Sequence, residues 1–196
     1  DTPNSFGRTY GEHRAFLELD DQAHYEVYKF AKEKGLDFVE TLCAKGCLSM
    51  LKLFTPDYLK VASRDLTNLP LLEAMAETKI PIILSTGMAT LAQVAMAYDT
   101  LIAAGAPMVS LLHCTTNYPC PKNEVNLRAM QTMKEAFKCT VGYSDHTMGT
   151  EIPIAAVTMG AEIIEKHFTL DRNMDGPDHK ASLEPHELKY MVDCIR

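Results

Sequence analysis

Residues 111–119, LLHCTTNYP, lead from an apolar pair directly into a cluster of hydrogen-bonding side chains. A buried strand is stabilised by its apolar residues and has no structural need of such an ending, so the cluster indicates a site at the end of the strand. Five other predicted strands end in the same way. Their polar residues are Thr41; Lys60 and Ser63; Ser85 and Thr86; Ser144, Asp145 and His146; and Glu165 and His167.

These six strands alternate with segments of helical periodicity, which predicts parallel βαβ units. We expect strands at residues 36–42, 58–63, 81–87, 107–114, 140–145 and 161–169. Helices are expected at residues 21–34, 47–54, 69–79, 91–105, 124–137, 152–160 and 184–196.

The polar strand ends distinguish between two α/β architectures. In an open doubly wound sheet, ligand-binding groups collect at one switch point, whereas in a (β/α)8 barrel every strand end faces a common site. Polar ends on all six strands favour the barrel. We therefore predict an α/β fold of the TIM (β/α)8 type, incomplete here, because a full barrel has eight strands and this chain provides about six βα units.

Length, charge and cysteine content narrow the class of protein. The 196 residues are long enough for one domain with a substantial core, and residues 1–196 are expected to form a single, partial barrel domain. The net charge of −7 is spread along the chain without basic runs, which argues against nucleic-acid binding. Without a membrane-spanning run or a signal peptide, a cytoplasmic protein with no membrane partner is expected. The six cysteines are expected to be reduced, and the CxxxC at residues 43–47 does not indicate a metal site.

Two histidines lie at the ends of neighbouring predicted strands. Residues two apart on a strand share a face, so Glu165 and His167 point the same way, as do Ser144 and His146. Two imidazoles leave positions on a divalent metal open for water and substrate oxygens, and a nearby carboxylate can accept a proton. A single histidine at a strand end is more often structural, so this spacing alone leaves both interpretations open.

Lys60 lies in an otherwise apolar strand, where an ammonium is costly to bury unless an anion meets it. One interpretation is a snorkelling surface lysine, or a lysine paired with Glu40 or Asp65. The other is a phosphate ligand, assisted by serine hydroxyls at neighbouring strand ends and by backbone N–H groups. These serines are Ser63, Ser85 and Ser144.

Residues 142–147 (GYSDHT), 165–172 (EKHFTLDR) and 176–185 (GPDHKASLEP), together with LLHCTTNYPCP and ILSTGMATL, resemble the barrel of the sialic acid synthase family. This family comprises N-acetylneuraminate synthase and bacterial relatives that make legionaminic or pseudaminic acid. The resemblance extends from about Tyr10 to the last residue. It implies condensation of phosphoenolpyruvate with an N-acetylated amino sugar, such as N-acetylmannosamine. The products would be a nine-carbon 2-keto acid and phosphate, and the cofactor would be Mn²⁺ or Mg²⁺.

The resemblance also implies a role for each matching residue. The metal ligands are His146 and His167. The residues around phosphoenolpyruvate are Thr41, Lys60, Ser63, Ser85 and Ser144. The residues facing the sugar or the metal-bound water are Glu165, Tyr118 and Asp178, and Thr116 also lines the pocket. Glu165 is expected to be the catalytic residue that handles a proton or stabilises developing positive charge.

Some features depart from the family pattern. Arg64 stands where the family has glycine, and Thr116 stands where better-known bacterial enzymes have asparagine. The family's first two strands are expected before Asp1, and its antifreeze-like domain, which covers the partner's sugar site in a swapped dimer, is expected after Arg196. We therefore expect a homodimer for the complete protein and weak or no turnover for this chain.

Two alternatives remain open. One is another phosphoenolpyruvate-dependent aldol-type synthase that acts on a phosphorylated aldose. The other is a noncatalytic chain that binds metal or phosphoenolpyruvate, or that associates with an intact synthase.

Overall fold

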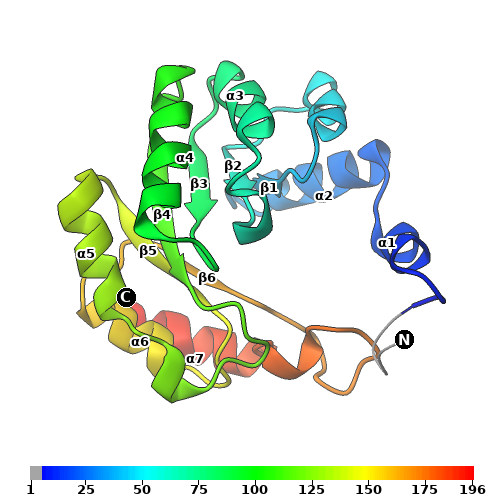
Figure 1. Cartoon of the computed structure of the whole chain (residues 1–196). Coiled ribbons are helices and arrows are strands. Elements are labelled where there is room, and N and C mark those ends of the chain that lie inside the picture. The colour runs from blue at the N-terminus through cyan, green and yellow to red at the C-terminus, as the bar shows by residue number, and fades with distance from the viewer. Residues whose placement is uncertain (1–5) are drawn as a thin grey trace.

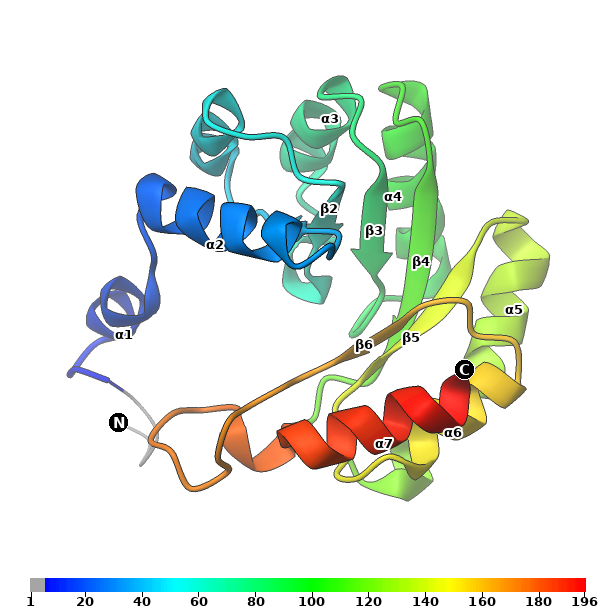
Figure 2. The same cartoon turned by 180° about the vertical axis from the view of Figure 1, so that it is seen from behind.

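The structure, a computed structural model, describes residues 6–196, in which six parallel strands form one sheet (Figure 1). Every strand pairs with the next one along the chain, in the order β1-β2-β3-β4-β5-β6. The strands are β1 (Val39–Thr41), β2 (Tyr58–Val61), β3 (Ile82–Ser85), β4 (Val109–Cys114), β5 (Val141–Asp145) and β6 (Ile164–Lys166). The sheet curls into half a barrel with α3, α4 and α5 along its outer side (Figures 1 and 2), so the predicted α/β fold of the TIM type is confirmed.

Helices connect the strands as the alternating pattern predicts. The helices are α1 (Tyr10–Leu17), α2 (Asp21–Glu33), α3 (Leu69–Glu77), α4 (Leu91–Ala103), α5 (Arg128–Phe137), α6 (Glu151–Thr158) and α7 (Pro185–Ile195). Shorter 3₁₀ turns are η1 (Lys45–Lys52), η2 (Ser63–Asp65), η3 (Lys122–Glu124) and η4 (His179–Ala181). Three helix starts follow from side-chain caps, because Asp20, Asn68 and Thr90 each accept a backbone N–H of the first turn.

The core lies between the sheet and the helices. All four residues of β3 are buried, and β2 and β4 are buried almost throughout, as expected for central strands of a parallel sheet. Leu59, Leu84 and Leu111 are fully buried on successive strands. Burying each such side chain contributes about 1.5–3 kcal/mol.

Asp57 ties α2 to the start of β2. Its carboxylate accepts the backbone N–H of Phe38 at 2.7 Å and the ammonium of Lys32 at 2.9 Å. The Phe38 N–H and then Lys32 hold the pKa of Asp57 below its usual value. This contact fixes the entrance to β1 and β2, whose far ends carry site residues.

Several elements differ from the sequence predictions. Of residues 47–54, expected as an α-helix, residues 47–52 lie in the 3₁₀ turn η1 and the last two lie outside any helix. The strand expected at 161–169 is reduced to the three residues of β6. The helix expected from residue 124 begins at Arg128 after the turn η3. Helix α1 was not predicted, because none of its residues is buried and it carries no core-facing apolar stripe.

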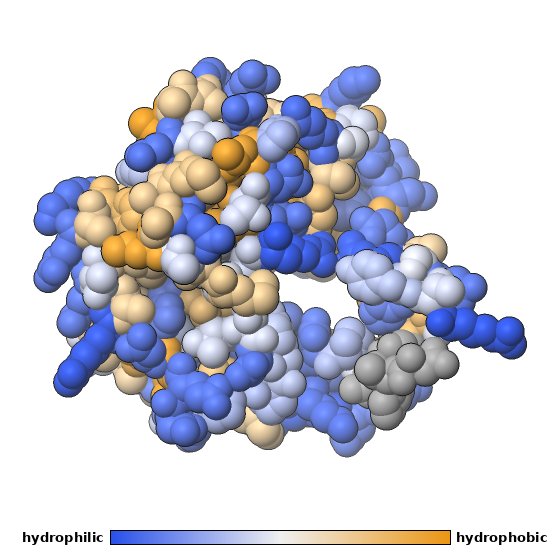
Figure 3. Space-filling view, viewed as in Figure 1, coloured by the Kyte–Doolittle hydropathy of each residue, from blue (hydrophilic) through white to orange (hydrophobic). Residues whose placement is uncertain are grey.

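The half barrel has an open side. Strands β1 and β6 are the two edges of the sheet within the described residues. The space-filling view shows the molecule hollowed between the barrel strands and the N-terminal helices (Figure 3). Over residues 6–196, no helix has the length and apolar character needed to cross a bilayer. All six cysteines have free thiols.

Candidate active site

A cavity of about 560 Å³ lies at the carboxyl ends of the strands. In a parallel α/β barrel, the carboxyl ends of all strands meet at one face, which is where side chains from different strands can converge. The cavity is lined by every predicted site residue except Asp178. These lining residues are Thr41, Lys60, Ser63, Ser85, Thr116, Tyr118, Ser144, His146, Glu165 and His167.

The two histidines lie side by side, as the alternation of strand residues predicts. Their ring centroids are 5.5 Å apart, and the ring of Tyr118 packs 4.0 Å from that of His146. Nδ1 of His146 lies 2.7 Å from the carbonyl oxygen of Thr115 and can donate to it, which leaves Nε2 as the acceptor nitrogen. Burial lowers the pKa of His146, so the ring is neutral at neutral pH, the form that binds a metal.

Asp178 lies at the margin of this pair. Its Oδ2 is 3.9 Å from Nδ1 of His167, beyond hydrogen-bond distance, and it does not line the cavity. The carboxylate is half exposed, on the segment that precedes η4. The structure therefore brings Asp178 near the histidine pair without bringing it into the cavity wall.

Lys60 is a buried cation at the base of the cavity. Only 5% of the residue is exposed, and its Nζ lies 3.2 Å from Oε2 of Glu165. The two carboxylates considered from the sequence have other partners, since Glu40 contacts His24 at 2.9 Å and Asp65 contacts Arg64. The interpretation of Lys60 as a surface lysine, or as the partner of Glu40 or Asp65, is therefore wrong.

Glu165 connects the lysine to the strand beside it. The hydroxyl of Ser144 donates to Oε1 of Glu165 at 2.7 Å, while Lys60 contacts the other carboxylate oxygen. Ser144 and Glu165 are register partners on β5 and β6, so the sheet itself places them opposite each other. The result is a continuous polar chain from β2 to β6 across the cavity.

Hydroxyl groups line the side of the cavity that contains Lys60. The Oγ atom of Ser85 is buried and has no hydrogen-bond partner within residues 6–196, although it lines the cavity. Buried hydroxyls are nearly always hydrogen-bonded, so this atom is available to a ligand. The Oγ atom of Ser63 accepts the N–H of Gly87 at 3.0 Å. A Cβ at Gly87 would lie 2.6 Å from the Thr116 side chain, so this close approach requires glycine.

Some of the lining residues were not predicted as part of the site, Lys166 and Ala62 among them. Met88 and Cys114 both line the cavity, and burial raises the pKa of the Cys114 thiol. Cys114 could have been found, because it lies two residues before Thr116 along the same extended segment. Arg64 also lines the cavity, with Nη2 2.7 Å from the sulfur of Cys43.

Tyr118 keeps its proton over a wide pH range. Burial, followed by the nearby Cys114 and Asp178, raises the pKa of Tyr118 to about 12. Its ring also lies edge-on to His167, with centroids 5.5 Å apart. The phenol is therefore a hydrogen-bond donor beside the histidine pair.

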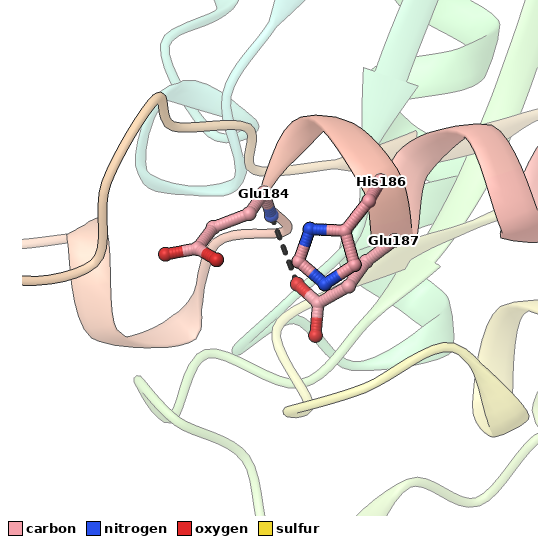
Figure 4. Close-up of side chains that lie close together, drawn as sticks. All are labelled: Glu184, His186 and Glu187. Carbon is pink, nitrogen blue, oxygen red and sulfur yellow. Dashed lines mark hydrogen bonds between the residues drawn. The ribbon is translucent and has the colours of Figure 1, made fainter.

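A second group of possible metal ligands lies at the start of α7 (Figure 4). Glu184, His186 and Glu187 place ligand atoms within 4.8 Å of one another. The Glu187 carboxylate already accepts the backbone N–H of Glu184 at 2.9 Å and the guanidinium of Arg172, which lowers the pKa of Glu187. Glu184 and Glu187 form a capping box for α7, and this box together with the Arg172 contact accounts for the cluster without a metal.

Fold and site together define a barrel of the TIM type whose polar cavity lies at the carboxyl ends of its strands. The sequence model of the NeuB family matches residues 2–196, and the chain belongs to this family. The chain is 51% identical, over 92% of its length, to N,N'-diacetyllegionaminic acid synthase of Campylobacter jejuni. It is 35% identical, over 98% of its length, to N-acetylneuraminate-9-phosphate synthase of Drosophila melanogaster.

Solved structures agree with this assignment. A sialic acid synthetase from Leptospira borgpetersenii, in complex with citrate, superposes with a TM-score of 0.88 at 36% identity, covering 95% of this chain and 67% of that one. A 3-deoxy-D-arabino-heptulosonate 7-phosphate synthase from Thermotoga maritima shares the fold, with a TM-score of 0.77 at 17% identity, covering 90% of this chain and 70% of that one. The chain spans 54% of the Campylobacter relative and 52% of the Drosophila one, about half of their length.

Proposed function

We propose that the complete protein condenses phosphoenolpyruvate with an N-acetylated amino sugar and releases phosphate, in a reaction that depends on Mn²⁺ or Mg²⁺. The product would be a nine-carbon 2-keto acid of the sialic acid type. The observation that carries this proposal is the single cavity that combines a buried lysine, an unpartnered serine hydroxyl and a pair of histidines. The names of the relatives, which are synthases of such acids, support it. We further propose that the complete protein acts in the cytoplasm as a homodimer.

The lysine side of the cavity is suited to the phosphate of phosphoenolpyruvate. Lys60 supplies a fixed positive charge, and Ser63, Ser85 and Thr41 supply hydroxyls around it. In the structure, the Lys60 ammonium is neutralised by Glu165 at 3.2 Å. A bound phosphate would compete for this ammonium and leave the Glu165 carboxylate available for proton transfer.

The histidine side of the cavity fits a divalent metal ion. His146 and His167 offer two imidazole rings side by side, and Nε2 of His146 is left available by the contact of Nδ1 with Thr115. Two protein ligands leave positions open for water and substrate, and the Asp178 carboxylate lies close by. When bound, such an ion polarises a carbonyl oxygen as a Lewis acid.

The remaining groups act directly on the substrates. Attack of the enol carbon on the sugar aldehyde creates positive character at the other end of the enol, which water then captures before the C–O bond to phosphate breaks. Glu165, held by Ser144, is positioned to accept a proton from that water or to stabilise the cation. The protonated phenol of Tyr118 can donate a hydrogen bond to the sugar, and Thr116 lines the same wall.

Phosphate release tests this proposal. The complete protein is incubated with Mn²⁺, phosphoenolpyruvate carrying ¹⁸O at its bridging oxygen, and one sugar at a time. The sugars are N-acetylmannosamine, its 6-phosphate, a diacetylated amino sugar and arabinose 5-phosphate. We expect phosphate that contains the label, and a nine-carbon 2-keto acid by mass spectrometry, with an acetylated amino sugar only. Chelation of the metal should stop the reaction.

The other outcomes separate the alternatives. Turnover with arabinose 5-phosphate, and with none of the acetylated sugars, would identify a different phosphoenolpyruvate-dependent synthase. Binding of phosphoenolpyruvate and Mn²⁺ by calorimetry, with no phosphate released, would identify a noncatalytic binding chain.

A further inference from the structure

A buried ion pair lies next to the two histidines, and its lysine, Lys166, also lines the cavity. Asp145 comes immediately before His146, and Lys166 comes immediately before His167. Nζ of Lys166 lies 2.6 Å from Oδ2 of Asp145, and only 2% and 0% of the two side chains are exposed. Asp145 and Lys166 are also register partners on β5 and β6, so the pair connects the two strands that carry the histidines.

The pair also fixes the chain beyond His146. Asp145 accepts the backbone N–H of Thr147 at 3.0 Å and its hydroxyl at 3.2 Å, and Lys166 donates to the carbonyl oxygen of Thr147. The backbone of His146 is therefore held on both sides, at Asp145 and at Thr147. Backbone bonds reinforce this arrangement, since the carbonyl of His146 accepts the N–H of Cys120 at 2.8 Å.

Stability alone is a poor explanation for this arrangement. A buried ion pair pays a large desolvation cost, and replacing both partners by neutral groups of similar volume often leaves stability unchanged or higher. The pair is neutral as a unit, so its net charge adds nothing to the cavity. Its hydrogen bonds join the ends of β5 and β6 to each other and to Thr147, and so restrict the placement of the two imidazoles that follow.

We propose that Asp145 and Lys166 are positioning residues that hold His146 and His167 in the orientation needed to share one divalent ion. This inference rests on the metal binding contained in the proposed function. It assigns to the pair a task separate from folding, so metal affinity and stability should respond differently to its removal.

The test compares Mn²⁺ binding with folding stability in matched double variants. Asp145→Asn combined with Lys166→Met removes both charges, the ion pair between the strands and the Lys166 contact with the Thr147 carbonyl, while keeping the side-chain sizes similar. Mn²⁺ affinity is measured by titration calorimetry, the geometry of the bound ion by electron paramagnetic resonance, and stability by urea unfolding. We expect near-normal stability, about 10- to 100-fold weaker Mn²⁺ binding, and an altered resonance spectrum.

A control double variant carries the same kind of change away from the site. Lys134 and Glu162 form an exposed pair at 2.9 Å, and Lys134→Met combined with Glu162→Gln should bind Mn²⁺ as the unmodified protein does. If the Asp145/Lys166 variant does not fold, the single variant Thr147→Val tests the positioning role in its place. It removes one hydrogen bond to Asp145 and should weaken Mn²⁺ binding by a few-fold.

The outcomes distinguish the two proposals. If the unmodified protein binds Mn²⁺ and the folded Asp145/Lys166 variant binds it with equal affinity, the positioning role is overturned and the proposed function is left intact. If the double variant does not fold, equal Mn²⁺ affinity of Thr147→Val and the unmodified protein would likewise overturn the positioning role. Unmodified protein that binds no Mn²⁺ would overturn the metal dependence itself and the positioning role with it.

Discussion

Replacing Lys60 by methionine should weaken phosphoenolpyruvate binding much more than it weakens the fold. Lys60 lies 3.2 Å from Glu165, an attraction of about 5 kcal/mol at an effective dielectric constant of about 20. Most of this is not lost on substitution, because 42% of the Glu165 side chain is exposed and its carboxylate can regain water. Methionine is similar to lysine in length and needs no hydrogen-bond partner. We expect the free energy of unfolding to fall by about 1 kcal/mol.

The substitution should reduce the free energy of phosphoenolpyruvate binding more than it reduces the free energy of unfolding. A hydrogen bond to a charged group contributes about 1.5–3 kcal/mol, so binding of phosphoenolpyruvate should weaken by about 10- to 150-fold. Titration calorimetry with phosphoenolpyruvate measures the affinity, and urea unfolding measures the stability. Lys134→Met removes an exposed lysine that is also paired with a glutamate, Glu162, and should leave both the affinity and the stability unchanged. Affinity within twofold of the unmodified protein, or a stability loss above about 3 kcal/mol, would refute the reasoning.

Three further predictions concern the metal site and the fold. His146→Ala or His167→Ala should abolish metal-dependent phosphate release with little change in the circular dichroism spectrum; full activity in either variant would contradict the metal assignment. Asp57→Asn should lower the free energy of unfolding by about 1 kcal/mol at pH 7, because the carboxylate loses a charge-assisted contact. Since the pKa of Asp57 is lowered by folding, its stabilisation is present above the ordinary value of 3.8 and is lost as pH falls through the lower folded-state value. The difference between Asp57→Asn and the unmodified protein in urea unfolding should therefore shrink below about pH 4, and a constant difference would argue against this role. Gly142→Ala should cost about 3 kcal/mol in the same assay, because its Cβ would lie 2.3 Å from the carbonyl oxygen of Ile163; a stability close to that of the unmodified protein would show that the strands can separate at no cost.

The order of strands and the face that carries the site follow from local sequence signals. Apolar runs bounded by glycine, proline and helix caps mark each βα unit, and a polar residue at each strand end marks the side of the sheet that faces ligand. The alternation within two neighbouring strands was sufficient to predict that Ser144 and His146 share a face, that Glu165 and His167 share a face, and that the two histidines lie side by side. These predictions succeeded because they depend on the two-residue period of a strand.

Other features depend on contacts between distant segments. The partner of Lys60 is Glu165 on β6, not Glu40 or Asp65, and only the closure of the half barrel brings the two together. The pairing of Asp145 with Lys166 likewise requires the register of two strands, which no single segment specifies. Helix α1 did carry a local signal, since Thr9 and Glu12 form a capping box, but without a buried face that signal is weak.

The register of β5 and β6 also limits how this part of the chain can vary in length. A one-residue deletion just before β6 that slid the strand by one position would place Lys166 where Glu165 stands and Phe168 where His167 stands. A cation would then replace the acid and an apolar ring the imidazole, although the composition of the strand had hardly changed. Insertions and deletions should therefore be tolerated in the turn after α6 only when β6 keeps its register against β5. An active variant selected from a library of random insertions and deletions in this turn should carry compensating changes that restore this register.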